Sequence, residues 1–131
     1  MITYVETSAA MKLLVDEAES NALADKLEEL RAAGETLVSS WLLHTELRCA
    51  ANRHPGDVAA DAVEAVLSGL ALVDIERADL TAAPSLPGPL RSADAIHLAS
   101  ALRVGCDVIL VYDEELRSAA SAVGIRPLSP S

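Results

Sequence analysis

Residues 107–112 read DVILVY, and this short stretch decides the fold class. It is almost entirely apolar, the pattern of a central strand in a parallel sheet, where helices cover both faces. Asp113 follows it directly, and a helix is expected over 114–123, closed by Gly124. A buried strand that leads straight into a helix is the building unit of an α/β protein.

The rest of the chain repeats this alternation of short strands and helices. Further strands are expected over 2–5, 36–38, 71–75 and 125–128. Further helices are expected over 9–15, 20–33, 41–53, 57–70 and 92–104, with a short helical turn over 76–82. Thr7 or Ser8 is the expected N-cap of the first helix, and Ser39 or Ser40 that of the third. The segment 84–89, PSLPGP, is expected to lack regular structure because it contains three prolines.

These elements predict a three-layer α/β fold with a mostly parallel central sheet. The chain has 131 residues, of which 51% are hydrophobic, so one domain over residues 1–131 is expected. Cys49 and Cys106 have no CxxC spacing and are interpreted as reduced core thiols, which makes a zinc site a poor hypothesis.

Charge limits what this protein can bind. Ten Lys and Arg stand against twenty Asp and Glu, giving a formal net charge of −10. Sequence-independent nucleic-acid binding rests on basic side chains that neutralise phosphates, so a passive DNA or RNA coat is a poor hypothesis. For the surface charges, acidity that only keeps the protein soluble is the better interpretation. Binding to a nucleic acid would need metal ions and a local basic patch. No apolar run approaches the roughly 20 residues that cross a bilayer, and no signal peptide is recognised, so a cytoplasmic protein without membrane contact is expected.

Four acids, Glu6, Glu46, Asp94 and Asp113, occupy positions where the pattern predicts a strand end or a core-facing helix face. Glu6 and Asp113 each follow an expected strand, and ligands of open α/β sheets bind at the carboxyl ends of strands. Glu46 and Asp94 lie within the apolar stripes of their helices. Acids are rarely buried without a partner, so an offsetting cation is the simplest hypothesis.

Each acid also has a structural interpretation. Asp94 could be a first-turn acid favoured by the helix dipole, and Asp113 could be an N-cap. Glu46 could pair with Arg48 or Arg53, or lie at the edge of its apolar stripe, and Glu6 could be exposed in a turn. Taken one at a time, each structural interpretation is as good as the cation-site hypothesis. To replace that hypothesis, however, all four structural interpretations would have to be correct at once. An oxygen-only ligand set suits Mg²⁺ or Mn²⁺, which can activate water for phosphodiester hydrolysis.

Four blocks of the sequence resemble a known family. They are YVETSAAMKLL (4–14), SSWLLHTELRCA (39–50), LRSADAIHLASAL (90–102) and VILVYDEELRSAASAVGI (108–125). Together, and in order, they resemble the PIN-domain family, and within it the VapC-type ribonuclease toxins of bacterial toxin–antitoxin pairs.

The resemblance implies a three-layer α/β/α PIN-like domain that binds Mg²⁺ or Mn²⁺ and cleaves RNA. The four acidic positions of the family fall, in order, on Glu6, Glu46, Asp94 and Asp113, and the hydroxyl after the first acid falls on Thr7 and Ser8. It also implies a homodimer, and a cognate antitoxin that clamps a hydrophobic groove and directs a basic side chain toward the acids.

One departure from the family pattern is Glu6, because the family has Asp there. The extra methylene moves the carboxylate by about 1.5 Å, and Mg²⁺ requires near-ideal octahedral geometry. A working natural variant, a weakened site and a deliberate substitution that made a toxic protein expressible are three open explanations.

Three function hypotheses follow. The first is a metal-dependent endoribonuclease toxin, and the second is a catalytically weakened PIN-like module that binds RNA or a partner. The third, a receiver-like or phosphatase-like protein with an aspartyl nucleophile, has little support in these residues. His97 is a candidate general base, although a helix-packing role is favoured. Phosphate contacts or solvated ion pairs are equally good interpretations of three arginines, Arg91, Arg103 and Arg117.

Overall fold

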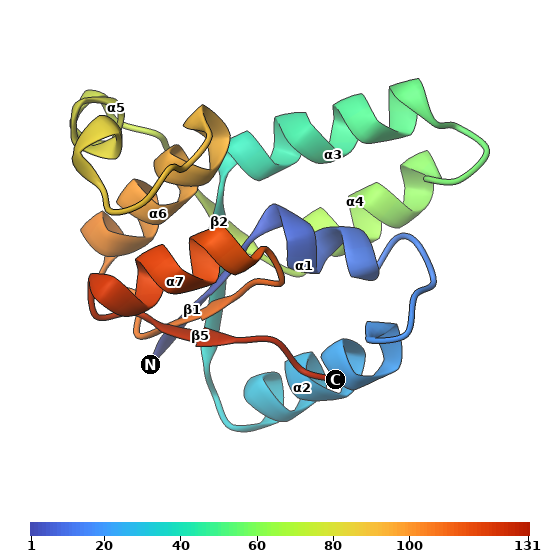
Figure 1. The fold of residues 1–131 in the computed structure, drawn as a ribbon. Coiled ribbons are helices and arrows are strands. Elements are labelled where there is room, and N and C mark those ends of the chain that lie inside the picture. The colour runs from blue at the N-terminus through green and yellow to red at the C-terminus, as the bar shows by residue number, and fades with distance from the viewer.

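The computed structural model describes all residues, 1–131. One sheet of five strands forms its centre, in the order β3-β2-β1-β4-β5, and all four strand pairings are parallel (Figure 1). The strands are β1 Ile2–Val5, β2 Thr36–Ser40, β3 Ala71–Val73, β4 Val108–Leu110 and β5 Arg126–Leu128. The predicted α/β class with a parallel sheet is therefore confirmed.

Seven α-helices and one 3₁₀ turn connect the strands. They are α1 Thr7–Lys12, α2 Ser20–Ala32, α3 Trp41–Arg53, α4 Ala60–Ser68, α5 Arg77–Ala82, η1 Ala83–Ser85, α6 Ser92–Val104 and α7 Glu114–Ala122. None of these helices is long and apolar enough to cross a membrane.

The strands alternate their side chains between two apolar layers. Val5 and Leu110 pack in a cluster with residues of α1, α2, α3 and α4. Tyr4 and Ile109, their neighbours along β1 and β4, pack on the opposite side with residues of α6 and α7. Helices thus cover both faces, as the apolar stretch 107–112 indicates, and the molecule has three layers.

Several predicted boundaries were wrong. Helix α1 begins at Thr7, two residues before the predicted start, because Glu6 and neither hydroxyl residue is its N-cap. Helix α4 begins at Ala60 because the backbone N–H groups of Asp57 and Val58 bond to His54 O and close a turn there. The strand predicted over 107–112 is regular only over β4.

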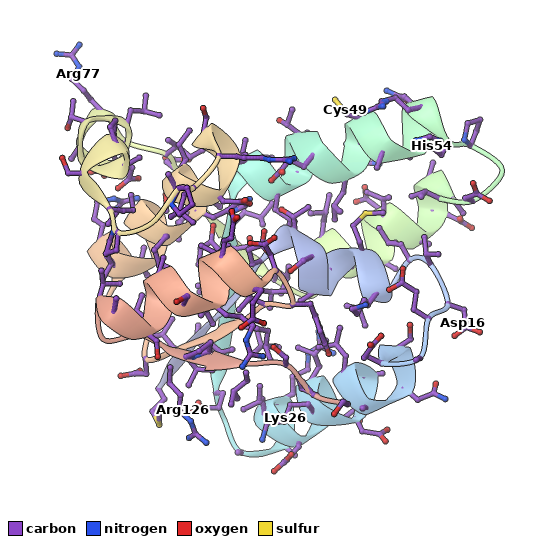
Figure 2. All side chains as sticks on the ribbon, in the orientation of Figure 1. Asp16, Lys26, Cys49, His54, Arg77 and Arg126 are labelled. Carbon is purple, nitrogen blue, oxygen red and sulfur yellow. The ribbon has the colours of Figure 1, made fainter.

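The prolines and one cysteine also differ from expectation. Pro84 lies in the first turn of η1, where its missing N–H is not needed, so segment 84–89 is not wholly irregular. Cys106 is a buried thiol as predicted, but Cys49 is exposed and points away from the fold (Figure 2). It lies on α3 between the buried positions Leu47 and Ala51, on the solvent side of that helix.

The carboxyl ends of all strands meet at one edge of the sheet, since every pairing is parallel. Glu6 follows β1 at this edge, and Asp113 lies three residues beyond the end of β4. Helix α6 ends at the opposite edge, where Asp107 Oδ2 accepts from Ile2 N at 3.0 Å. Its first turn, which carries Asp94, is therefore at the same edge as Glu6 and Asp113.

Candidate functional site

Glu6 is buried and caps the helix that follows it. Its side chain is the N-cap group of α1, and Oε2 accepts from Ser8 N at 2.8 Å and from Ser8 Oγ at 2.5 Å. The residue is only 2% exposed, so the exposed-turn interpretation was wrong. Burial raises the pKa of Glu6, and the Ser8 hydrogen bonds only partly oppose this effect. The other oxygen, Oε1, has no hydrogen-bond partner.

Glu46 is held through one oxygen by two donors. Its Oε1 accepts from Thr7 Oγ1 at 2.7 Å and from His97 Nε2 at 2.5 Å, which leaves Oε2 without a partner. Burial would raise the pKa of Glu46, but the hydrogen bonds from His97 and Thr7 outweigh it and lower the pKa. The suggested pairing with Arg48 was wrong, because Arg48 forms an ion pair with Glu64.

Asp94 and Asp113 lie at helix starts, as their structural interpretations predicted. Asp113 is the N-cap of α7 and accepts from Leu116 N at 2.9 Å through Oδ2. Asp94 is in the first turn of α6, is half-buried, and forms no hydrogen bond. Burial raises the pKa of Asp94, and the negative charges of Asp113 and Glu46 raise it further. Because capping uses only Oδ2 of Asp113, Oδ1 stays free, and the capping role is compatible with metal binding by Asp113.

The four acids are electrostatic neighbours around Asp94. Its pKa responds to Asp113 and Glu46, and the pKa of Glu6 responds in turn to Asp94. However, no group of three or more acidic, His or Cys side chains lies close enough to hold a metal ion in this structure. The acids are therefore assembled at one edge of the sheet but are not gathered into a finished metal cluster.

The donor chemistry nevertheless fits a hard divalent cation. Glu6, Glu46 and Asp113 each have one oxygen fixed by a protein donor and one oxygen free, whereas both oxygens of Asp94 are free. Free carboxylate oxygens without His or Cys ligands are what Mg²⁺ and Mn²⁺ prefer. Burial is the main cause of the raised pKa values of Glu6 and Asp94, and the nearby positive charges oppose it only in part.

His97 is buried at the centre of this edge. Its Nδ1 lies 2.6 Å from Tyr4 Oη, and its Nε2 lies 3.0 Å from Thr7 Oγ1 as well as close to Glu46. The residue is 0% exposed, so the expected helix-packing role is confirmed. Both ring nitrogens have protein partners, which argues against a general base facing solvent. Tyr4 was not among the residues singled out from the sequence, although a buried phenol in a central strand needs a polar partner.

The three candidate arginines have different environments. Arg103 donates to Asp79 at 2.8 Å, and Arg117 is bound to Ser129 and lies near Glu114. The side chain of Arg91, the N-cap residue of α6, forms no ion pair or hydrogen bond, and its charge acts on Asp94 to lower the pKa of that acid. Of the three, only Arg91 is free to contact a phosphate beside the acids.

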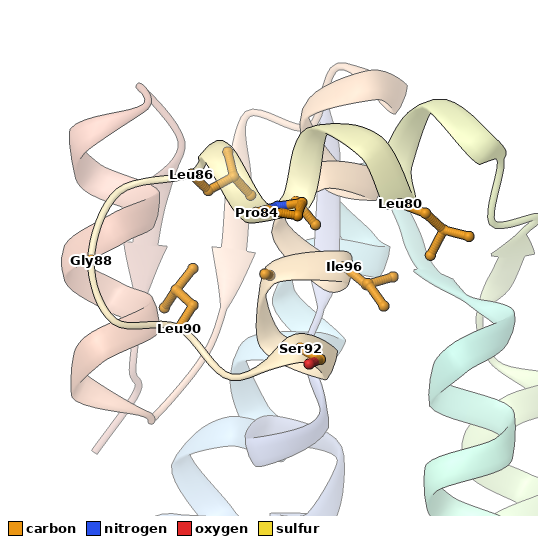
Figure 3. Close-up of a pocket in the computed structure, with 9 residues that line it drawn as sticks. Leu80, Pro84, Leu86, Gly88, Leu90, Ser92 and Ile96 are labelled. Carbon is orange, nitrogen blue, oxygen red and sulfur yellow. The ribbon is translucent and has the colours of Figure 1, made fainter.

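The largest cavity of the molecule is separate from these acids. It has a volume of about 370 Å³ and lies between α5, η1, the 86–90 segment and the start of α6 (Figure 3). Leu86 and Leu90 lie on one side of it, and Leu80 and Ile96 on the other. Six of its nine lining residues are hydrophobic and none is acidic or basic. It therefore lacks the groups for catalysis.

Known proteins resemble this chain over nearly its whole length. The sequence profile of the PIN domain matches residues 3–122. Ribonuclease VapC35 of Mycobacterium tuberculosis is 38% identical over 97% of this chain and 96% of that protein, and Ribonuclease VapC46 of the same species is 37% identical over 98% and 97%. The crystal structure of VapBC2 from Rickettsia felis bound to a DNA fragment from their promoter superposes with a TM-score of 0.79. It covers 100% of both chains at 13% identity, which shows a shared fold.

Proposed function

This chain belongs to the PIN-domain family and, within it, to the VapC type, and from that premise we propose that it is a metal-dependent endoribonuclease. Relatives of 37–38% identity over nearly all of the chain bear the name ribonuclease. The single observation that carries the proposal is the set of free carboxylate oxygens on Glu6, Glu46, Asp94 and Asp113 at one edge of the sheet.

These four residues would hold the metal, and they are also the proposed catalytic residues. Mg²⁺ or Mn²⁺ bound there would supply activated water and would stabilise charge on a phosphoryl group. The protein contributes the positions of its acids, since capping bonds fix Glu6 and Asp113, and Thr7 and His97 fix Glu46. Arg91 lies beside Asp94 and would bind an RNA phosphate.

The proposed partners are RNA as substrate, a cognate antitoxin as inhibitor, and a second copy of the chain in a homodimer, in the cytoplasm. The antitoxin proposal is supported by membership of the VapC type and by the electrostatics of the site. Burial raises the pKa values of Asp94 and Glu6, and repulsion from neighbouring acids raises them further, so a basic side chain inserted among the acids would stabilise their charged forms. An Arg would also bind a carboxylate bidentately.

A second candidate function is a catalytically weakened module that binds RNA or a partner. Two observations favour it: the carboxylate of Glu6 caps its own helix, and the acids are not gathered within metal-binding distance. Under this alternative the extra methylene of Glu6 holds its free oxygen away from the position that an Asp oxygen would occupy.

Cleavage of a fluorophore–quencher RNA separates the two candidates. We expect the wild-type chain to cleave with Mn²⁺ or Mg²⁺ and to be inactive in EDTA. Asp94→Ala should reduce the rate at least a hundredfold, because it removes the acid with two free oxygens. Asp16→Ala is the matched control, since Asp16 is an exposed acid that points away from the fold (Figure 2).

Glu6→Asp decides the remaining question. Equal or slower cleavage by this variant would show that Glu6 is a working ligand, and the endoribonuclease proposal would stand. If only the Asp form cleaves, the weakened module is correct for this chain. If neither form cleaves RNA with any divalent cation, the enzyme proposal is wrong.

A further inference from the structure

We propose that His97, oriented by Tyr4, is a positioning residue that fixes one oxygen of Glu46 and reserves the other for a ligand of the site. This inference rests on the proposed function. Four elements meet in the contacts that carry it: Tyr4 comes from β1, Thr7 from α1, Glu46 from α3 and His97 from α6.

The contacts form a continuous buried chain. Tyr4 Oη and His97 Nδ1 are 2.6 Å apart, and both residues are 0% exposed. Their rings meet edge to face, with centroids 5.7 Å apart and an interplanar angle of 74°. His97 Nε2 lies 2.5 Å from Glu46 Oε1, and Thr7 Oγ1 lies 2.7 Å from the same oxygen. The phenol, the imidazole and the carboxylate are thus linked without an intervening water.

The partners determine where the protons lie. An ionised carboxylate can only accept, so Nε2 must carry the hydrogen that is donated to Glu46. In a neutral imidazole Nδ1 is then an acceptor, and the Tyr4 hydroxyl donates to it. Thr7 donates its single hydroxyl hydrogen to Glu46, and its oxygen can accept a share of the Nε2 hydrogen at 3.0 Å. Tyr4 therefore selects the tautomer of His97 that faces Glu46.

The consequence is an asymmetric carboxylate. Two donors from two different helices bind Oε1, whereas Oε2 has no partner and the Glu46 side chain is 26% exposed. Rotating the carboxylate would break both bonds at once. Metal-ligating residues are commonly oriented by such second partners, whose removal weakens metal affinity or activity by about 10–100-fold. Leu or Phe would fill the same volume without buried polar atoms, so packing alone does not explain a Tyr–His pair that ends on an acid.

Two substitutions remove one donor each and leave the volume nearly unchanged. Tyr4→Phe deletes only the hydroxyl that donates to Nδ1, and His97→Leu deletes the donor to Glu46. His97→Gln is the conservative variant, since its amide N–H can donate in place of Nε2–H. Tyr112→Phe is the matched control, because the Tyr112 hydroxyl donates to Pro130 O at 2.7 Å, away from His97.

Three measurements apply to each variant: imidazole ¹⁵N chemical shifts for the tautomer, isothermal titration with MnCl₂ alone, and kcat and KM for RNA cleavage. The chain has only three His, so the imidazole signals of His97 are assigned as those missing from the spectrum of His97→Gln. We expect the Nε2–H tautomer in the wild type and in Tyr112→Phe, and a tautomer mixture in Tyr4→Phe. Mn²⁺ affinity and kcat should fall about tenfold in Tyr4→Phe and more in His97→Leu, with KM unchanged and His97→Gln within about threefold of the wild type.

The outcomes separate this inference from the proposed function. If Tyr4→Phe matches Tyr112→Phe in Mn²⁺ affinity and kcat while the wild type is active, the positioning role is wrong. An Nδ1–H tautomer in the wild type would also overturn it. If the wild type neither binds Mn²⁺ nor cleaves RNA, the proposed function fails, and the positioning role fails with it even where the spectrum shows the Nε2–H tautomer.

Discussion

Of the four acids of the site, Asp94 is the one whose carboxylate is least stabilised by neighbouring groups. It has no hydrogen-bond donor, and burial together with the charge of Asp113 raises its pKa above the ordinary value of 3.8. The dipole of α6 favours an acid in this first turn by a few tenths to about 1 kcal/mol, whereas burial and the neighbouring acids oppose its ionisation. The ionised form of Asp94 therefore opposes folding when no cation is bound.

This gives a prediction for Asp94→Asn. A raised folded pKa means that the folded state binds more protons than the unfolded state, so the stability of the wild type falls as pH rises above 3.8. We expect the variant to gain about 1 kcal/mol of unfolding free energy at pH 7 in EDTA, measured by urea denaturation. The gain should narrow toward pH 3.8. Saturating Mn²⁺ should make the wild type more stable than the variant, because only the wild type retains the Asp94 carboxylate as a metal ligand.

Asp61→Asn is the control for this substitution. Asp61 is an exposed acid in the first turn of α4 and is not near the four acids of the site. We expect it to gain no stability at pH 7, since an exposed carboxylate keeps its hydration. A stability loss for Asp94→Asn in EDTA would contradict the interpretation that burial and neighbouring acids destabilise the charge of Asp94.

At the scale of elements, a buried acid fastens α5 to α6. Asp79 is 2% exposed and accepts from Glu76 N at 3.0 Å, Ser100 Oγ at 3.1 Å and Arg103 Nε at 2.8 Å. Burial alone would raise the pKa of Asp79, but the bonds from Arg103, the Glu76 backbone and Ser100 outweigh it and lower the pKa. Arg103 also donates to Asp74 O at 2.7 Å, which ties it to the segment after β3.

Asp79→Asn should therefore destabilise the fold by about 2–3 kcal/mol at pH 7, because it leaves the Arg103 charge without its partner. A lowered folded pKa gives stability that is present above the ordinary value of 3.8 and is lost as pH falls below it. The difference between variant and wild type should accordingly shrink below pH 3.8. Asp74→Asn, which keeps the backbone acceptor, should change stability by less than about 0.5 kcal/mol. Equal urea midpoints for Asp79→Asn and the wild type would refute the fastening role.

Local signals explain which elements the sequence could predict. The bounds of α3 and α6 were predicted correctly, and Gly105, with φ 80°, ends α6 in the left-handed conformation that favours glycine. The start of α1 was wrong because Ser and Thr are preferred at N-caps, and here Glu6 takes that place beside both. The N-cap preference for Ser and Thr therefore indicated the wrong residue. The actual N-cap, Glu6, is also the residue that differs from the family pattern.

The site was predictable in its location but not in its contacts. Glu6 and Asp113 were placed correctly at the carboxyl edge because strand ends are visible in the sequence. The hydrogen bond between Thr7 and Glu46 spans 39 residues, and that between Tyr4 and His97 spans 93. Such pairs depend on how helices pack across the sheet, and no local pattern encodes them.

At the scale of the whole molecule, helices cover both faces of the sheet, so its carboxyl edge is the open place for a ligand. That edge is acidic, and the chain has a net charge of −10. Arg91 is a basic residue beside Asp94, whereas Arg77 and Arg126 lie at the periphery of the molecule (Figure 2). A polyanion that approaches the acids is therefore repelled unless cations intervene.

Association with RNA should consequently require divalent cations. We expect a labelled single-stranded RNA to bind at least tenfold more weakly in EDTA than with Ca²⁺ at equal ionic strength, measured by fluorescence anisotropy. Ca²⁺ is chosen because it is a hard cation that takes oxygen ligands. Arg91→Ala should weaken binding about 3–10-fold with Ca²⁺, because Arg91 is the unpaired basic residue beside Asp94, while Arg77→Ala should leave it unchanged. Equally tight binding in EDTA would mean that RNA is held by another surface, away from the four acids.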